Sequence, residues 1–171
     1  LFPHNPEHCS PYSPSSRLFK NVLYLAVDSI DDFAECEAAQ AQINNTDFQA
    51  QLQTLRDSEL VDYSNVGALK YPALEMLYTS FREKHLQTNS VRAQAFRDFQ
   101  SRGGEMLRRH ALFEALQADF YGGDNNMWGW PVWPQDYRNP AHRAVREFAQ
   151  THLERVEFYE YLQWQADVQL A

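Results

Sequence analysis

The sequence predicts a mainly α protein, with five or six helices and two ordered, proline-rich loops. Three observations indicate this fold class. The 171 residues suffice for one domain with a sizeable core. Apolar residues recur at the helical period through most of residues 29–171. Only residues 21–28 have the β-branched and aromatic composition of a strand, and no partner strand is apparent.

The chain begins with a loop and a short extended segment, residues 1–28. Four of the eight prolines fall in residues 1–20. Because proline fixes φ and constrains the residue before it, we expect an irregular but ordered loop there. Residues 21–28, NVLYLAVD, predict one short extended stretch. Residues 29–171 are then expected to form a helical subdomain.

The first two predicted helices cover residues 29–43 and 46–55. The first has a serine as its N-cap and carries Asp31 and Asp32 in its opening turn, where carboxylates favour the positive helix end. The second opens on a threonine, which is also a favoured N-cap.

Longer helices are expected beyond residue 60. A third lies within residues 61–86, where Pro72 should kink or start it. A fourth follows Ser90, is broken by the glycine pair 103–104, and ends at the pair 122–123.

The second irregular loop covers residues 124–139, and one long terminal helix follows it. Asn139 is the predicted N-cap of that helix and Pro140 its first residue. Its apolar stripe consists of Ala141, Val145, Phe148, His152, Val156 and Tyr159.

The charge and the cysteine content limit the classes of partner. The net charge is −8, from 23 acids and 15 bases, which argues against binding to nucleic acid or to an anionic membrane. The longest apolar run is too short to span a bilayer. Cys9 and Cys36 imply no disulfide framework, although a single bridge stays open, and a reducing cytoplasm is the expected location.

Metal binding is the first chemistry considered. The run HNPEHC places four ligand types within six residues: His4, Glu7, His8 and Cys9. No CxxC pair accompanies it, so ordinary loop polarity is favoured over zinc, and we expect neither metal nor cofactor.

A catalytic carboxylate pair is the second chemistry considered. The candidates are Asp31 with Asp32, Asp62, Glu157 and Glu160. Their positions are typical of helix starts and solvated helix faces, so we expect surface or capping groups and no catalytic pair.

Trp128, Trp130 and Trp133 form the third candidate, among prolines and a glycine. Such rings stack on sugars, or they pin a loop to a core. The structural role is favoured, because large aromatics dominate core burial.

The segment SPYSPSSRLFKNVLYLAVDSIDDF resembles the loop of the amylomaltases, or 4-α-glucanotransferases, whose pattern is roughly S-P-Y-x-S-x-S-x-x-x-x-N-x-x-Y-I-D-L. The segments VDYSNVGALKYPAL, WGWPVWP and VEFYEYLQWQADVQ are similar to further segments of that family, in the same order along the chain.

This resemblance implies the helical insertion of a (β/α)8-barrel enzyme that transfers α-1,4-glucan segments between maltodextrins by a retaining mechanism. It implies that Ser10 and Tyr12 bind substrate, with Tyr12 as a platform for a glucosyl ring. The family's three catalytic carboxylates lie in motifs that are absent here, so none is assigned and the chain alone should be inactive. Gly67 stands where some members carry an aromatic residue for a second glucan site. The implied partners are malto-oligosaccharides and the remainder of the barrel.

Two other hypotheses remain open at this point. One is a non-enzymatic helical module that binds glucan or protein through Tyr12 and the tryptophans. The other is a zinc-dependent helical protein.

Overall fold

The computed structural model describes residues 16–170, in which every regular element is helical and no strand occurs. The mainly α prediction is confirmed for these residues. The six α-helices are α1 (Glu37–Ile43), α2 (Thr46–Asp57), α3 (Tyr63–Phe81), α4 (Val91–Gly123), α5 (Arg143–Thr151) and α6 (Leu153–Gln169).

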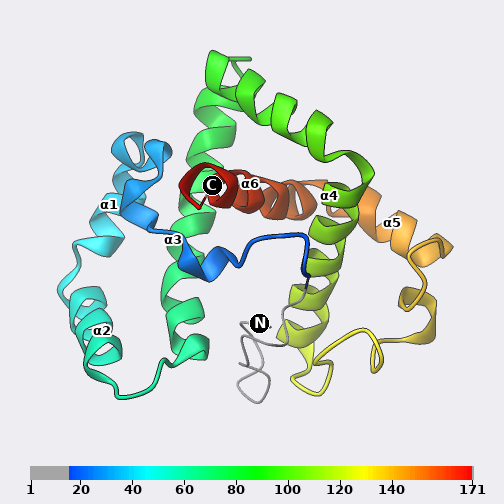
Figure 1. Cartoon of the computed structure of the whole chain (residues 1–171), viewed down its shortest axis with the longest axis horizontal. Coiled ribbons are helices and arrows are strands. Elements are labelled where there is room, and N and C mark those ends of the chain that lie inside the picture. Colours follow the sequence, from blue (N-terminus) through cyan, green and yellow to red (C-terminus); the bar gives the residue numbers. More distant parts are fainter. Residues whose placement is uncertain (1–15, 171) are drawn as a thin grey trace.

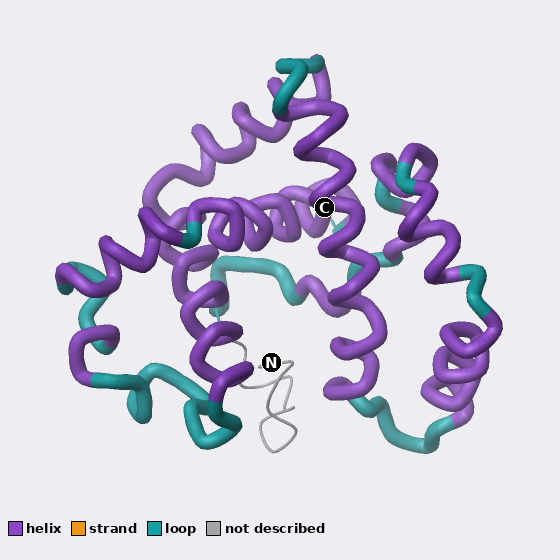
Figure 2. Tube along the Cα trace, turned by 180° about the vertical axis from the view of Figure 1, so that it is seen from behind, coloured by secondary structure: helices purple, strands orange, loops and turns teal. Residues whose placement is uncertain are grey.

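Helix α6 is the central element of the fold. It passes between α3 and the second half of α4, with α1 and α2 beyond α3 and with α5 at its own beginning (Figures 1 and 2). Its buried residues are Val156, Phe158, Tyr159, Glu160, Tyr161, Leu162, Gln163, Trp164, Gln165 and Ala166. Burial all round explains why this helix shows no single apolar stripe.

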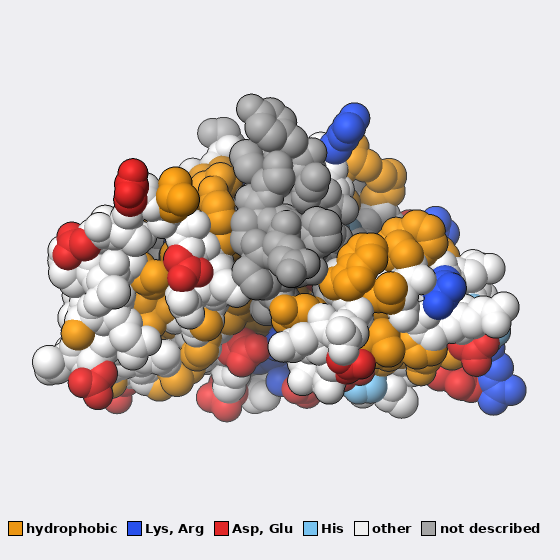
Figure 3. Space-filling view, turned by 90° about the horizontal axis from the view of Figure 1, so that it is seen from below, with side chains coloured by type: hydrophobic (Ala, Val, Ile, Leu, Met, Phe, Trp, Pro, Cys, Tyr) orange, Lys and Arg blue, Asp and Glu red, His pale blue; other side chains and the backbone are white. Residues whose placement is uncertain are grey.

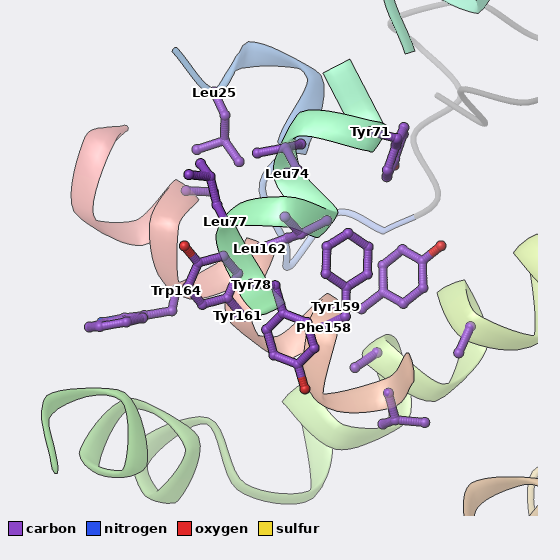
Figure 4. Packing of buried hydrophobic residues seen from close by; sticks show 14 of the residues in the cluster. Leu25, Tyr71, Leu74, Leu77, Tyr78, Phe158, Tyr159, Tyr161, Leu162 and Trp164 are labelled. Atoms are coloured by element: carbon purple, nitrogen blue, oxygen red, sulfur yellow. The ribbon is translucent and has the colours of Figure 1, made fainter. Parts of the chain in front are cut away.

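Aromatic and leucine side chains of α3 and α6 make up much of the core (Figure 4). The rings of Phe81 and Tyr161 lie 5.1 Å apart, and those of Phe96 and Trp164 lie 5.3 Å apart. Each large side chain buried in this way contributes about 1.5–3 kcal/mol. The core therefore fixes α6 against α3 and against the first half of α4.

Several predicted helix boundaries agree with the structure. Ser90 caps α4, since its Oγ accepts a hydrogen bond from the N–H of Ala93 at 3.2 Å. Helix α2 begins at Thr46, although the capping side chain is that of Asn45. Gly104 adopts φ 52° and ψ −142°, so the predicted break within α4 is confirmed.

The extended stretch predicted for residues 21–28 is wrong. The structure has two 3-10 turns there, Val22–Tyr24 and Val27–Ser29. The strand-like sequence pattern has another cause: the side chains of Leu23, Leu25 and Val27 are buried and those between them are exposed. Alternate residues face the helices beneath, so the period of two arises without a sheet.

The helix predicted from Ser29 is also wrong in its first turns. Residues Asp31–Glu35 form a 3-10 helix without a side-chain cap, and α1 begins only at Glu37. Asp31 and Asp32 bind Arg92 rather than a helix end. A distant partner therefore decides the local conformation.

The third helix falls within the predicted range, with Pro72 inside α3 and a π-helical turn, Arg82–Leu86, after it.

The prediction of a single terminal helix is wrong. Helix α5 begins at Arg143, with His142 as its cap, and a non-helical His152 (φ −119°, ψ 36°) separates α5 from α6. Asn139 closes a turn instead, because its Oδ1 accepts from the N–H of Ala141 at 2.9 Å.

Candidate functional site

Ser10 and Tyr12, the predicted substrate-binding residues, lie outside the described residues. The structure does describe the polypeptide that follows them. Residues 16–28, which we call the anchored segment, cross the molecule between α3 and the second half of α4 (Figure 1). The candidate site is therefore the set of side chains that hold this segment in place.

Two glutamines of α6 hold the backbone of the anchored segment. The side chain of Gln163 accepts from the N–H of Lys20 at 3.1 Å and donates to its carbonyl at 2.9 Å. Gln169 repeats the arrangement on Ala26, at 2.9 and 3.0 Å. Each amide satisfies both polar groups of one residue, as a neighbouring strand would. The segment is thereby fixed at two points six residues apart.

Lys70 of α3 holds the stretch between those two points. Its Nζ donates to the carbonyls of Leu23 and Leu25 at 2.6 and 2.9 Å. Burial lowers the pKa of Lys70, while the nearby charge of Asp28 opposes that shift. Charge-assisted bonds of this kind are about twice as strong as neutral ones. Lys70 therefore ties the segment to a second helix.

An aromatic contact from α4 completes the anchor. The ring of Phe19 stacks on His110 with centroids 4.3 Å apart and planes 5° from parallel. Burial lowers the pKa of His110 to about 4, so its imidazole is neutral at physiological pH. The Nε2 of His110 lies 3.4 Å from the Nε2 of Gln163. Since the amide nitrogen is a donor, that contact requires an unprotonated ring nitrogen.

The anchoring side chains come from segments that carry the family resemblance. Lys70 belongs to VDYSNVGALKYPAL, and Gln163 and Gln169 belong to VEFYEYLQWQADVQ. Asn21 belongs to the loop pattern itself, and its Oδ1 caps the following 3-10 turn by accepting from the N–H of Leu23 at 3.0 Å. The segments thus meet in space, which sequence reasoning did not predict. The available signal was the glutamine-rich end of an otherwise apolar helix.

A buried ion pair lies under the next part of the chain. Asp32 was predicted to be solvated, but it is only 2% exposed. It accepts from the Nε and NH2 of Arg92, the latter at 2.7 Å, and from the hydroxyl of Tyr161 at 2.6 Å. The guanidinium of Arg92 also lies 4.8 Å from the Trp164 ring centre. This network joins residues 31–35 to α4 and α6.

The other candidate carboxylates also have structural partners. Asp62 caps α3 as predicted, accepting from the N–H of Asn65 at 3.0 Å. Glu157 accepts from the hydroxyl of Tyr78 at 2.7 Å. The surface position predicted for Glu160 is wrong: it is 6% exposed, accepts from Gln100 at 2.6 Å, and has its pKa raised by burial. It is buried because α6 is enclosed on all sides.

The three tryptophans have different surroundings. Trp133 is 2% exposed and packs against Phe113 and Phe120, with centroids 5.3 and 5.4 Å apart. Trp128 is 36% exposed. Trp130 is 55% exposed and lines a groove beside α4 and α5. The ring of Trp133 therefore packs in the core, whereas that of Trp130 is accessible to a ligand.

The metal candidate His4, Glu7, His8 and Cys9 lies outside the described residues. Within residues 16–170, no three His, Cys, Asp or Glu side chains are grouped so that they could hold a metal ion. Cys36 is a free, buried thiol whose Sγ lies 3.6 Å from the carbonyl of Met76. No helix in the same range is both long enough and apolar enough to cross a membrane.

Comparison with known proteins gives consistent matches. A family model described as 4-alpha-glucanotransferase matches residues 1–171. The chain is 33% identical over 174 residues to a 4-alpha-glucanotransferase of Haemophilus influenzae, covering 99% of this chain and 25% of that protein. It is 32% identical over 163 residues to one of Mycobacterium tuberculosis, covering 95% and 20%. The chain thus spans about a fifth to a quarter of the length of these relatives.

Proposed function

This chain belongs to the 4-alpha-glucanotransferase family, and we propose that it forms the helical insertion and the substrate-binding loop of such an enzyme. The whole enzyme transfers α-1,4-glucan segments between maltodextrins with retention of configuration. Its partners are malto-oligosaccharides and the remainder of a (β/α)8 barrel. It works in the cytoplasm. Residues 1–28 are the loop part of the chain, and residues 29–171 are the helical support.

The anchored segment is the observation that carries this proposal. Gln163 and Gln169 hold it from α6 while Lys70 holds it from α3, so two helices fix residues 20–26, which follow Ser10 and Tyr12 in the sequence. A binding loop needs such support, because a misplacement of about 1 Å costs on the order of 100-fold in rate. The helical subdomain therefore serves to position the loop.

Within that loop, Tyr12 stacks on the apolar face of a glucosyl ring and Ser10 donates or accepts a hydrogen bond. An aromatic platform suits a pyranose ring, because the ring exposes C–H groups on one face and hydroxyls at its edge. Retaining transfer needs two carboxylates roughly 5–5.5 Å apart across the scissile bond. We assign those carboxylates to the barrel outside this chain, since the acids described here cap helices or hold buried contacts.

Disproportionation of maltotriose tests the assignment. The full-length enzyme that contains this chain should release glucose and form longer maltodextrins, which chromatography of the products detects. The 171-residue chain alone should give no products. Turnover by the chain alone would contradict the placement of the catalytic carboxylates, and failure of the full-length enzyme to act on maltotriose would contradict the proposed reaction.

A further inference from the structure

A groove of about 580 Å³ lies between the second half of α4, the helix α5 and the loop that joins them. That volume is in the range of roughly 300–1,000 Å³ typical of small-ligand sites. On the α4 side its residues recur at the helical spacing: Glu105, Arg108, Arg109, Leu112, Phe113 and Leu116. They form one face of that helix. Val145 and Ala149 face them from α5.

The groove combines an apolar floor with an accessible aromatic wall. Leu116, Val145 and Ala149 are buried in its floor. Trp130 lines the groove and keeps 55% of its surface exposed. In the view from below, hydrophobic side chains lie together on the side that carries residues 124–142 and α5, with basic and acidic side chains around them (Figure 3). An exposed indole over an apolar floor suits a ligand with a flat apolar face.

The polar lining of the groove includes Glu105, Tyr137, Gln150 and four arginines, which are Arg108, Arg109, Arg138 and Arg146. Three of them are oriented by contacts with the protein. Arg109 donates to Glu105 at 2.7 Å, Arg138 donates to the carbonyl of Trp133 at 2.7 Å, and Arg146 donates to the carbonyl of Ala141. A guanidinium has five N–H donors in a fixed plane, so each of these keeps donors for a ligand.

We propose that this groove is a glucan-binding site, in which Trp130 stacks on a glucosyl unit and the arginines donate to its hydroxyls. The proposal rests on the proposed function, which makes an α-1,4-glucan the available polymer. A glucan matches both features of the groove, because each glucose unit has an apolar face and a rim of hydroxyl acceptors. The groove would bind a part of a long glucan that lies away from its reacting end.

The groove is separate from the anchored segment. His110, which stacks on Phe19, lies on another face of α4 from the groove residues. Figure 1 shows residues 16–28 on one side of this half of α4, and α5 with residues 124–142 on the other. Gly67, the position of an aromatic in some family members, lies in α3. The groove is thus a third location, and only long glucans should reach it together with the loop.

Fluorine NMR of the full-length enzyme labelled with 5-fluorotryptophan tests the site directly. The resonance of Trp130 is assigned as the one lost in Trp130→Phe. Maltoheptaose should shift that resonance in a saturable way, and inorganic phosphate should not. No shift with maltoheptaose overturns the proposal, and a shift with phosphate alone would make the groove an anion site. This readout needs no turnover, so it stands apart from the test of the reaction.

Steady-state kinetics with a long and a short substrate provide a second test of the groove. Trp130→Ala should raise KM for long-chain amylose at least fivefold and leave kcat and KM for maltotriose unchanged. Met106→Ala is the matched control, since Met106 is 56% exposed on α4 and does not line the groove. Equal effects on both substrates, or none on either, would overturn the proposal.

Two arginine variants test the groove independently, in case the tryptophan variant misfolds. Arg109 and Arg143 each bind a glutamate four residues away on an exposed helix face, at 2.7 and 2.6 Å, but only Arg109 lines the groove. Arg109→Ala should raise the amylose KM and Arg143→Ala should not. The same amylose KM in both variants would contradict the role of the arginines.

Discussion

Replacing Gln163 by leucine should release the anchored segment while the core stays folded. Leucine has nearly the same size but cannot form the two hydrogen bonds to Lys20. A hydrogen bond contributes about 0.5–1.5 kcal/mol net, so the loss is about 1–3 kcal/mol. This corresponds to a rise of about five- to 150-fold in the equilibrium constant for detachment of the segment.

Hydrogen exchange of the Lys20 amide measures that change directly. In the full-length enzyme its protection should fall by the same factor in Gln163→Leu, because exchange requires detachment from the side chain. Gln94→Leu is the control, since the Gln94 side chain bonds the exposed Asp98 of its own helix, at 3.0 Å. Unchanged protection of Lys20 in Gln163→Leu would refute the view that α6 holds the segment.

Three further predictions concern single sites. Asp32→Asn breaks the buried pair with Arg92 and should cost about 3–5 kcal/mol of unfolding free energy in urea titrations; a loss below 1 kcal/mol would contradict it. Gly104→Ala should cost about 1–3 kcal/mol because φ is +52°, whereas Gly122→Ala, with open space and no positive φ, should cost nothing measurable. The pKa of His110 is about 4 in the folded chain against an ordinary 6.5. Between these two pH values the unfolded chain therefore binds a proton at His110 that the folded chain does not. Stability should therefore be complete above pH 6.5 and fall by up to about 3 kcal/mol towards pH 4, and His110→Phe should remove this dependence; an unchanged pH profile in that variant would count against it.

Local signals in the sequence predicted a large part of the fold. Ser90 and Gly104 act within a few residues of themselves, so an N-cap and a helix break could be recognised without knowing the tertiary structure. The same holds for Asp62, whose carboxylate caps the helix that follows it. Element type and most boundaries depend on such short-range interactions.

The errors arise where a distant partner decides. Asp32 looks like a residue of a solvated helix start. In the structure it is buried because it forms hydrogen bonds with Arg92 and Tyr161, which are distant in the sequence. Gln163 looks like an ordinary polar residue, but its structural role is to bind the backbone of Lys20. Such pairs cannot be read from spacing, because the chain folds back before they meet. The family resemblance predicts a substrate-binding loop near the start of the chain, and the structure describes the side chains that hold the residues after it.

The most direct test of the central claim is the steady-state kinetics of Tyr12→Ala in the full-length enzyme. If Tyr12 is the platform for a glucosyl ring, kcat/KM for maltotriose should fall about tenfold or more, since stacking together with burial of the ring is worth at least about 1.4 kcal/mol. Tyr12→Phe keeps the ring and should retain most of the activity, and the melting temperature should change little in either variant. An unchanged kcat/KM in Tyr12→Ala would contradict the assignment of this chain as the carrier of the substrate-binding loop.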